Sequence, residues 1–139
     1  MRVIGLDVGE RRIGVAVSDP LGIISQGVTV IERKDLQSDI EEIIRIAGDY
    51  EAQSVVVGMP INMDGTRGKS AEKVSEFVAV LESSIKIPVA TYDERLSTKE
   101  SEKFLISSDV SRKKRKAVVD KIAAQLILES YLERIKKNV

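Results

Sequence analysis

Hydrophobic positions alternate or cluster along the chain in a way that divides it into strands and helices. Three short runs rich in β-branched residues come first, at 3–6, 13–17 and 23–31, and the turn residues between them are few enough for antiparallel hairpins. Residues 54–58 include three consecutive valines, and this loss of alternation predicts a strand buried on both faces. Residues 87–92 form the last predicted strand.

Helical spacing of apolar residues fills the remaining segments. It occurs within residues 36–47 and again within 74–81. Residues 97–100 (Ser-Thr-Lys-Glu) have the form of a capping box and predict a short helix to about residue 107. A final helix begins within residues 112–116 and runs almost to the end of the chain. Its larger apolar residues, expected to face the core, are Val118, Val119, Ile122, Leu126, Tyr131, Leu132 and Ile135.

The resulting order, βββαβαβαα, predicts an α/β fold in one domain over residues 1–139. The sheet is mixed, because a three-strand meander leads into parallel crossovers, and helices cover both of its faces. Right-handed crossovers place the first and fourth strands side by side at the centre of the sheet. Ligands of such sheets bind beyond the carboxyl ends of the strands, so we expect a site there.

Composition removes several kinds of chemistry, since the chain has no Cys, His or Trp. Thiol nucleophiles, disulfides and zinc–cysteine sites are excluded, and so are imidazole bases and Ser-His-Asp triads. Catalysis would have to use carboxylates, Lys, Ser or Thr, or a hard metal ion. No apolar run approaches the roughly 18–20 residues of a membrane span, and Asp7 interrupts the position of a secretory signal. A cytoplasmic protein with no membrane partner is therefore expected.

Acidic residues stand at three positions where the predicted fold could bring them together. Asp7 ends the first strand, and Asp93 and Glu94 directly follow the last strand. Asp120 lies early in the final helix, on one stripe with small residues that would let the helix approach the sheet closely. The stripe residues are Ala123, Ala124 and Ile127. Because neighbouring residues of an extended chain point to opposite faces, only one of Asp93 and Glu94 can face Asp7, and the pattern leaves open which one.

Each acid also has a purely structural interpretation. Asp7 can cap the following turn or pair with an arginine, the second site can be an ordinary acidic turn, and Asp120 can form a salt bridge within its helix. The available partners are Arg11 and Arg12 for Asp7, and Lys116 and Lys121 for Asp120. Taken together, however, three carboxylates without a histidine are typical of a site for Mg²⁺ or Mn²⁺.

Positive charge is concentrated beside these acids. The chain has 22 Lys+Arg and 22 Asp+Glu, but residues 112–139 hold 9 basic and 3 acidic residues. Arg112, Lys113, Lys114, Arg115 and Lys116 are consecutive, and they stand at a helix start, where positive charge is unfavourable to the helix dipole. A solvated helix start would be the simple explanation. An external anion is the alternative, and acids surrounded by bases suit metal-assisted cleavage of a phosphodiester.

Five segments of the sequence resemble one known family, the YqgF family. They are Leu6-Asp7-Val8-Gly9, Arg12-Ile13-Gly14-Val15-Ala16-Val17-Ser18-Asp19, Val57-Gly58-Met59-Pro60 with Asp64-Gly65-Thr66, Asp93-Glu94-Arg95-Leu96-Ser97-Thr98, and Asp120-Lys121-Ile122-Ala123-Ala124. The resemblance spans nearly the whole chain, in order. These bacterial RNase H-like proteins are described as Holliday junction resolvases and as candidate nucleases for the 5′ end of pre-16S ribosomal RNA.

The resemblance implies an RNase H-like fold with sheet order 3-2-1-4-5 and an acidic metal site. The implied catalytic residues are Asp7, Glu94 or Asp93, and Asp120. Related junction resolvases have their second acid on the fourth strand, where this chain has Gly58 and Met59, so here that acid comes from the fifth strand. In the mechanism this suggests, Asp7 bridges two Mg²⁺ ions about 3.5–4 Å apart, Glu94 and Asp120 complete the ligands, and one ion activates water.

Nucleic acid is the expected partner. Arg95 can bind the scissile phosphate or pair with Asp93, and the loop over residues 62–69 can border the cleft or be a plain surface connection. The expected substrate-binding residues are Arg11, Arg12, Asn62, Asp64, Thr66, Arg95, Ser97, Thr98, Arg112, Lys113, Lys114, Arg115 and Lys116.

The function expected first is a metal-dependent nuclease that processes the 5′ end of pre-16S rRNA, in contact with pre-ribosomal particles. The alternatives are a Holliday junction resolvase acting on branched DNA, a non-catalytic RNA- or ribosome-associated factor, and a phosphate-binding ATPase, for which a single domain of this size is too small. The sequence does not distinguish structured RNA from branched DNA, because backbone contacts are independent of sequence. It also leaves open whether the protein is a monomer or a homodimer.

Overall fold

The computed structural model describes residues 1–61, 64–93 and 112–137, and within the last range it describes side chains from Ile122 to Ile135. The strands and helices in these ranges agree with the sequence pattern to within a few residues. The helix predicted to end near residue 107 lies outside them. The elements are β1 (Val3–Val8), β2 (Arg12–Ser18), β3 (Ser25–Glu32), α1 (Leu36–Asp49), β4 (Ser54–Met59), α2 (Lys69–Ser84), β5 (Val89–Asp93) and α4 (Arg112–Lys137).

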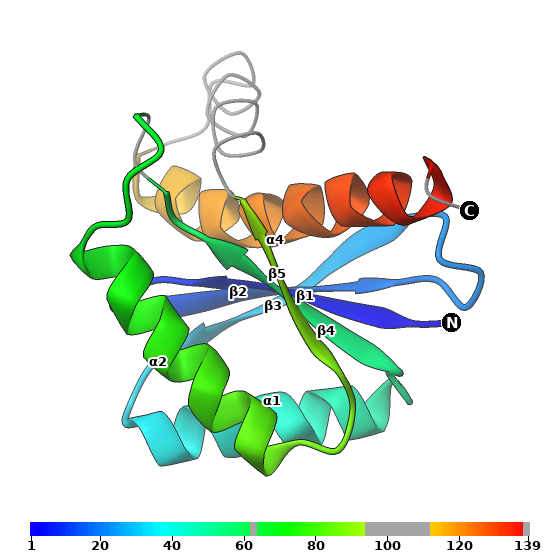
Figure 1. The fold of residues 1–139 in the computed structure, drawn as a ribbon, viewed down its shortest axis with the longest axis horizontal. Helices are drawn as coiled ribbons and strands as arrows, with labels where there is room; N and C mark the ends of the chain where they lie inside the picture. The colour runs from blue at the N-terminus through cyan, green and yellow to red at the C-terminus, as the bar shows by residue number, and fades with distance from the viewer. Residues whose placement is uncertain (62–63, 94–111, 138–139) are drawn as a thin grey trace.

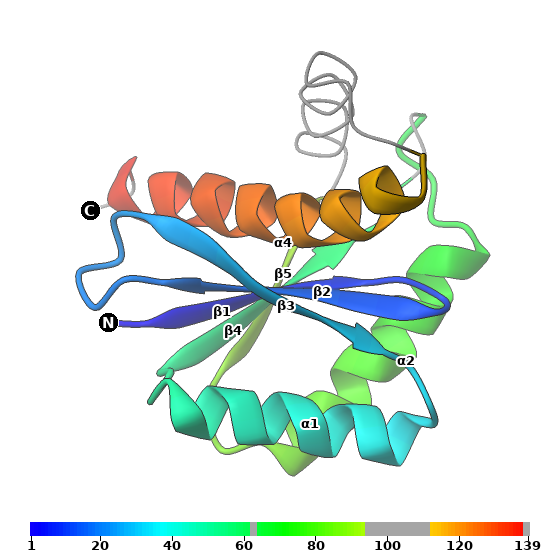
Figure 2. The same cartoon turned by 180° about the vertical axis from the view of Figure 1, so that it is seen from behind.

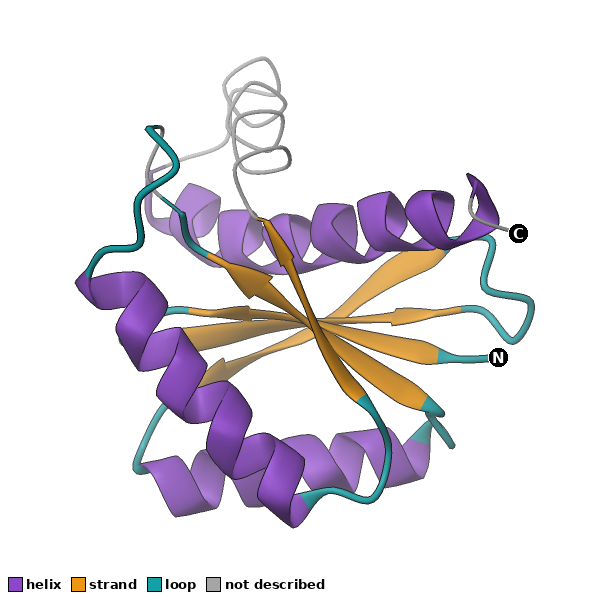
Figure 3. Cartoon of the chain, in the orientation of Figure 1, coloured by secondary structure: helices purple, strands orange, loops and turns teal. Residues whose placement is uncertain are grey.

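The five strands form one twisted sheet in the order β3-β2-β1-β4-β5, as expected (Figures 1 and 3). β1 pairs antiparallel with β2, and β2 pairs antiparallel with β3, so these three strands are the predicted meander. β1 pairs parallel with β4, and β4 with β5. The first strand is therefore central, and its carboxyl end lies at the same edge of the sheet as those of β4 and β5.

Helices cover the two faces of the sheet in separate layers. Figure 2 shows α4 along one face and α1 with α2 along the other. Alternation along β1 divides its residues accordingly, since Ile4 and Leu6 belong to the apolar cluster beneath α1 and α2, whereas Val3 belongs to the cluster beneath α4. Odd-numbered residues of β1 therefore face α4.

The layer formed by α1 is fixed at its start by a side-chain cap. The Asp35 carboxylate accepts a hydrogen bond from the backbone N–H of Ser38 at 2.8 Å, and this bond lowers the pKa of Asp35 below its ordinary value. Ile40, Ile43 and Ala47 then bury the apolar face of the helix against the sheet. The periodic apolar positions of residues 36–47 thus pack as the sequence predicts.

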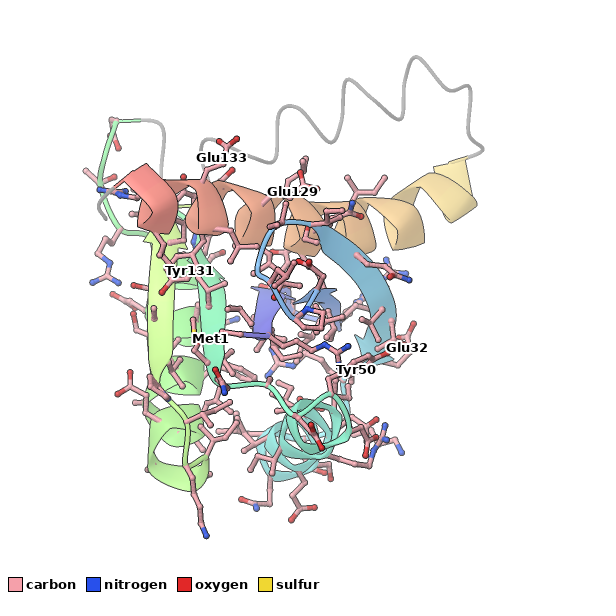
Figure 4. The ribbon with its side chains drawn as sticks, turned by 90° about the vertical axis from the view of Figure 1, so that its right-hand side faces the viewer. Met1, Glu32, Tyr50, Glu129, Tyr131 and Glu133 are labelled. Carbon is pink, nitrogen blue, oxygen red and sulfur yellow. The ribbon has the colours of Figure 1, made fainter. Side chains whose placement is uncertain are left out.

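The layer formed by α4 confirms that the stripe of small residues lies against the sheet, but of the larger apolar residues predicted to face the core it buries only Leu132 among those whose side chains are described. Ala123, Ala124, Ile127, Leu128 and Leu132 are buried, while the larger side chains of Ile122, Leu126 and Tyr131 are only half-buried. Small residues lie innermost because the helix is close to the sheet. Glu129 and Glu133 point away from the sheet on the outer side of α4 (Figure 4).

Candidate active site at the carboxyl end of the central strand

Asp7 lies near the end of β1 on the face of the sheet that α4 covers. Residues 5 and 7 face the same side of the sheet, because side chains alternate along a strand. A Cβ atom added at Gly5 would meet α4, so the side chain of Asp7 faces α4 as well. The neighbouring positions on both adjacent strands are glycines: Gly14 of β2 pairs with Asp7, and Gly58 of β4 follows the partner of Leu6. Asp7, half-buried, is therefore the one side chain that the three central strands place on this face at this level.

Gly5 allows α4 to lie directly against β1. A Cβ atom at Gly5 would be 2.8 Å from Leu128 Cβ and 3.0 Å from the carbonyl oxygen of Ala124, closer than side chains pack. Farther along the helix, Leu132 lies near Gly22 and the carbonyl of Met1, at the start of β1. The helix therefore runs antiparallel to the strand.

This direction places the Asp120 backbone at the level of Asp7. Asp120 precedes Ala124 by four residues, which is about 6 Å along a helix, and Asp7 follows Gly5 by two residues, which is about 7 Å along a strand. The start of α4 and the carboxyl ends of β4 and β5 lie at the same end of the molecule (Figure 1). The side chain of Asp120 lies outside the part of the chain whose side chains are described.

Asp93 lies on the opposite face of the sheet from Asp7. It pairs with Met59, which belongs to the cluster beneath α1 and α2 together with Val89 of its own strand. Tyr92, one residue earlier, packs against the cluster beneath α4. Asp93 and Asp7 are therefore not brought together, and Glu94 lies outside the described residues.

The β1–β2 turn places basic residues beside Asp7. Arg11 is exposed in the turn, and Arg12 opens β2 on the α4 face, two residues from Gly14. The turn is tight, since the Gly9 N–H donates to the Arg12 carbonyl at 2.8 Å, and a Cβ atom at Gly9 would be 2.9 Å from that oxygen. Both arginines are thus held within a short, hydrogen-bonded turn at the site.

The other predicted substrate-binding residues fall in three groups. Asp64 and Thr66 are exposed and bond to each other, with the Thr66 N–H and hydroxyl donating to Asp64 Oδ1 at 2.9 and 2.6 Å. The basic residues from Arg112 to Lys116 form the first turns of α4, at the Asp7 end of the sheet, and their side chains are not described. Asn62, Arg95, Ser97 and Thr98 lie outside the described residues.

Two features of the site had weak signals or none in the sequence. Gly14 and Gly58 interrupt strand patterns, and such a glycine indicates a close approach by another group. Arg33 and Asp39 bond to each other below the β1–β2 turn, on the face opposite to α4, and no spacing pattern links them. Arg33 contacts the β1–β2 turn, where its Nη1 donates to the Gly9 carbonyl at 2.8 Å.

A hollow of about 780 Å³ lies between β3 and α1 on the other face of the sheet. Several of its charged side chains pair with one another, since Arg45 contacts Glu42 and donates to Asp49 Oδ2 at 2.8 Å, and the Arg45 bond lowers the pKa of Glu42. Among the described residues no three acidic side chains form a metal-binding group. The edge of the sheet at Asp7, where carboxylates and arginines gather, is the better candidate site.

None of the described helices is both long enough and apolar enough to cross a membrane.

Comparisons with known proteins agree with this architecture. Residues 1–134 match the family model described as "RuvX: Holliday junction resolvase". A protein of Halothermothrix orenii named "Putative pre-16S rRNA nuclease" is 54% identical over 132 residues, covering 95% of this chain and 94% of the relative. A protein of Natranaerobius thermophilus with the same name is 48% identical, covering 99% of both.

Solved structures at low sequence identity have the same fold. RuvC of Thermus thermophilus in complex with a Holliday junction substrate aligns with a TM-score of 0.63 at 14% identity, covering 98% of this chain and 96% of that chain. The Fowlpox virus resolvase in complex with Holliday junction DNA aligns with a TM-score of 0.55 at 17% identity, covering 97% and 99%. These likenesses confirm the RNase H-like fold, and the family match confirms the resemblance seen in the motifs. The chain belongs to the RuvX (YqgF) family.

Proposed function

We propose that this chain is a metal-dependent nuclease that processes the 5′ end of pre-16S rRNA. The observation that supports this most is the position of Asp7. A half-buried carboxylate stands between two glycines at the carboxyl end of the central strand, and the turn of α4 that contains Asp120 lies at the same level. The names of the relatives give the substrate that we propose.

Mg²⁺ or Mn²⁺ fits the donors available at this edge. Oxygen ligands suit hard cations, and the chain has neither histidine nor cysteine to favour a softer metal. We assign the metal to Asp7, Glu94 and Asp120, and we prefer Glu94 to Asp93 because alternation along β5 directs Asp93 to the opposite face. When bound, the metal would activate water and offset the negative charge that develops on the phosphate.

The chain's own residues would bind and orient the substrate. Arg12 lies on the same face as Asp7 and would hold the phosphate next to the scissile bond, while exposed Arg11 would contact a neighbouring phosphate. The basic start of α4 extends this surface at the same end of the sheet. Such contacts recognise backbone shape, which suits a structured RNA in a cytoplasmic pre-ribosomal particle.

Resolution of branched DNA is the second candidate, because the matching family model is described as a Holliday junction resolvase. Symmetric cleavage of a four-way junction needs two active sites, so this function requires a homodimer. Trimming an RNA end needs only one site. The oligomeric state of the protein under assay conditions therefore helps to distinguish rRNA processing from junction resolution.

The test is cleavage of two labelled substrates, a pre-16S 5′ leader RNA and a four-way DNA junction, with Mg²⁺ or Mn²⁺. The wild type is compared with Asp7→Asn and with the control Asp49→Asn, which makes the same change at an exposed position of α1. We expect RNA cleavage by the wild type and the control, and retained RNA binding without cleavage by Asp7→Asn.

Each other outcome has a defined meaning. Paired nicks in the junction, made by a dimer and lost in Asp7→Asn, would support the resolvase instead. Binding of RNA without cleavage by the wild type under either metal would indicate a non-catalytic ribosome-associated factor. Cleavage that survives in Asp7→Asn would contradict the assignment of the site.

A further inference from the structure

Asp39 is the one buried carboxylate among the described side chains, with 3% of its surface exposed. It stands in the first turn of α1, on the face of the sheet opposite to α4. Its Oδ2 accepts a hydrogen bond from Arg33 Nε at 2.9 Å, and its Oδ1 accepts one from the backbone N–H of Lys34 at 3.1 Å. Both carboxylate oxygens of Asp39 therefore accept hydrogen bonds from Arg33 and Lys34, which lie between β3 and α1.

Arg33 in turn holds the β1–β2 turn at two carbonyl groups. Its Nη1 donates to the Gly9 carbonyl at 2.8 Å, and its backbone N–H donates to the Arg11 carbonyl at 2.9 Å. The turn is closed by the Gly9 N–H bond to Arg12. One residue therefore fixes both ends of the segment that follows Asp7 and includes Arg11.

The contacts of Arg33 use three features of an arginine side chain. The guanidinium stacks over the Phe77 ring, 5.5 Å from its centroid, while one arm reaches Asp39 and another reaches Gly9. A planar fork can bind a carboxylate and a carbonyl at fixed angles, whereas the ammonium of a lysine is a single point of charge. A partly buried ion pair is by itself weak evidence for stability, so the contact of this pair with the β1–β2 turn needs another explanation.

We propose that Arg33 and Asp39 are positioning residues that hold the Gly9–Arg12 turn so that Arg11 and Arg12 meet the phosphates of a nucleic acid bound at Asp7. The proposal rests on the proposed function for its substrate. Its structural part, the control of the turn by Arg33, is independent of that substrate. Neither residue touches the reacting groups, since both lie on the α1 and α2 face of the sheet.

The experiment compares Arg33→Lys and Asp39→Asn with the control Arg45→Lys, which alters an exposed arginine of α1 that also binds two carboxylates. Four quantities are measured: amide hydrogen exchange at Gly9, the Kd for the leader RNA, the split between KM and kcat, and the melting temperature. We expect exchange at Gly9 to rise about tenfold and Kd and KM to rise about tenfold, from the loss of one charged hydrogen bond. The value of kcat should change little, and Arg45→Lys should resemble the wild type.

A purely structural pair would give a different pattern. It would lower the melting temperature and the active fraction, and so the apparent kcat, while leaving Gly9 exchange, Kd and KM unchanged, and this result would overturn the proposal. Asp39→Asn keeps the shape of the side chain and serves if Arg33→Lys does not fold. If the wild type binds neither RNA nor a DNA junction, the proposed function fails, whereas unchanged Gly9 exchange in the variants is what refutes control of the turn.

Discussion

The acidic side chains at the carboxyl edge of the sheet lie on different faces of the sheet. Asp7 points toward α4, whereas Asp93 pairs with Met59 and points toward α2. A carboxylate on the wrong face of a sheet cannot share an ion with Asp7, because the backbone lies between them. The choice between Asp93 and Glu94 is thus a question of strand register, which the sequence of one strand does not reveal.

Replacing Glu94 should therefore harm cleavage more than replacing Asp93. We expect Glu94→Gln to slow single-turnover RNA cleavage by about 100-fold, as loss of a metal ligand or its support does, and Asp93→Asn to slow it only a few-fold. Rates are measured at several Mn²⁺ concentrations, and Glu94→Gln should also need more metal. Equal losses in both variants, or a larger loss in Asp93→Asn, would reverse the assignment.

Asp19 gives a residue-scale prediction that does not depend on catalysis. Its Oδ1 accepts backbone N–H bonds from Ile23 at 2.6 Å and Ile24 at 2.9 Å, and the bond from Ile24 is the main cause that lowers the pKa of Asp19 below 3.8. A lowered folded-state pKa means that the ionised carboxylate stabilises the fold above pH 3.8 and that this contribution is lost as the pH falls through the folded value.

Asp19→Asn should consequently have a lower melting temperature than the wild type at pH 7. At acid pH the two melting temperatures should become equal. Thermal unfolding from pH 7 down to about pH 2 measures the difference from the wild type. Glu82→Gln, at an exposed position of α2, is the control and should track the wild type throughout. A difference for Asp19→Asn that stayed constant down to the lowest pH would show that the charge is irrelevant to the β2–β3 turn.

Packing of α4 on the sheet is the feature at the scale of elements that places Asp120 near Asp7. Contact is closest at Gly5, which meets Ala124 and Leu128, and Ser25 adds a hydrogen bond from its hydroxyl to the Gln125 carbonyl at 2.9 Å. The helix therefore has little freedom to move away from the strands. Any side chain at Gly5 must displace it.

Gly5→Ala should separate the helix from the sheet and lower the free energy of unfolding by about 1–3 kcal/mol, the usual cost of overpacking. Gly48→Ala is the matched control, since a Cβ atom there has nothing within 4 Å and the residue lies in α1. That control should raise stability by about 0.5–1 kcal/mol. Urea unfolding gives both values.

Cleavage by Gly5→Ala should fall by more than the folded fraction explains, because the turn containing Asp120 moves with the helix. Single-turnover rates, corrected for the folded fraction, test this point. Full activity in a destabilised Gly5→Ala variant would mean that the distance from α4 to β1 does not matter for the chemistry.

The elements were predictable from the sequence because apolar periodicity is a local property. Residues 36–47 and the three valines of β4 each reveal their own burial without a partner. The small residues of α4 predicted which stripe approaches the sheet, but the strand residue that it meets was not predictable, since Ala124 packs against a glycine more than a hundred residues away. The Arg33–Asp39 pair was missed for a related reason, because its meaning lies in a contact with Gly9 rather than in any spacing.

At the scale of the whole molecule, charge is segregated although the net charge is zero. Five consecutive basic residues start α4 and two arginines lie in the β1–β2 turn, all at the Asp7 end of the sheet, whereas the other end of α4 mixes both signs, with Glu129 and Glu133 on its outer side among Arg134, Lys136 and Lys137 (Figure 4). A neutral chain can bind a polyanion strongly only through such an uneven distribution. Binding should therefore release counterions mainly at the Asp7 end.

Salt dependence tests this distribution directly. The logarithm of Kd for the leader RNA should rise linearly with the logarithm of salt concentration, and Arg11→Gln should reduce the slope by about one, as loss of one phosphate contact does. Lys86→Gln removes an equally exposed charge just before β5, at the opposite end of the sheet, and should leave the slope unchanged. Equal reductions in both variants would mean that the RNA is held by the overall surface rather than at the Asp7 edge, whereas the expected difference would locate the phosphate path beside the carboxylate that we assign to cleavage.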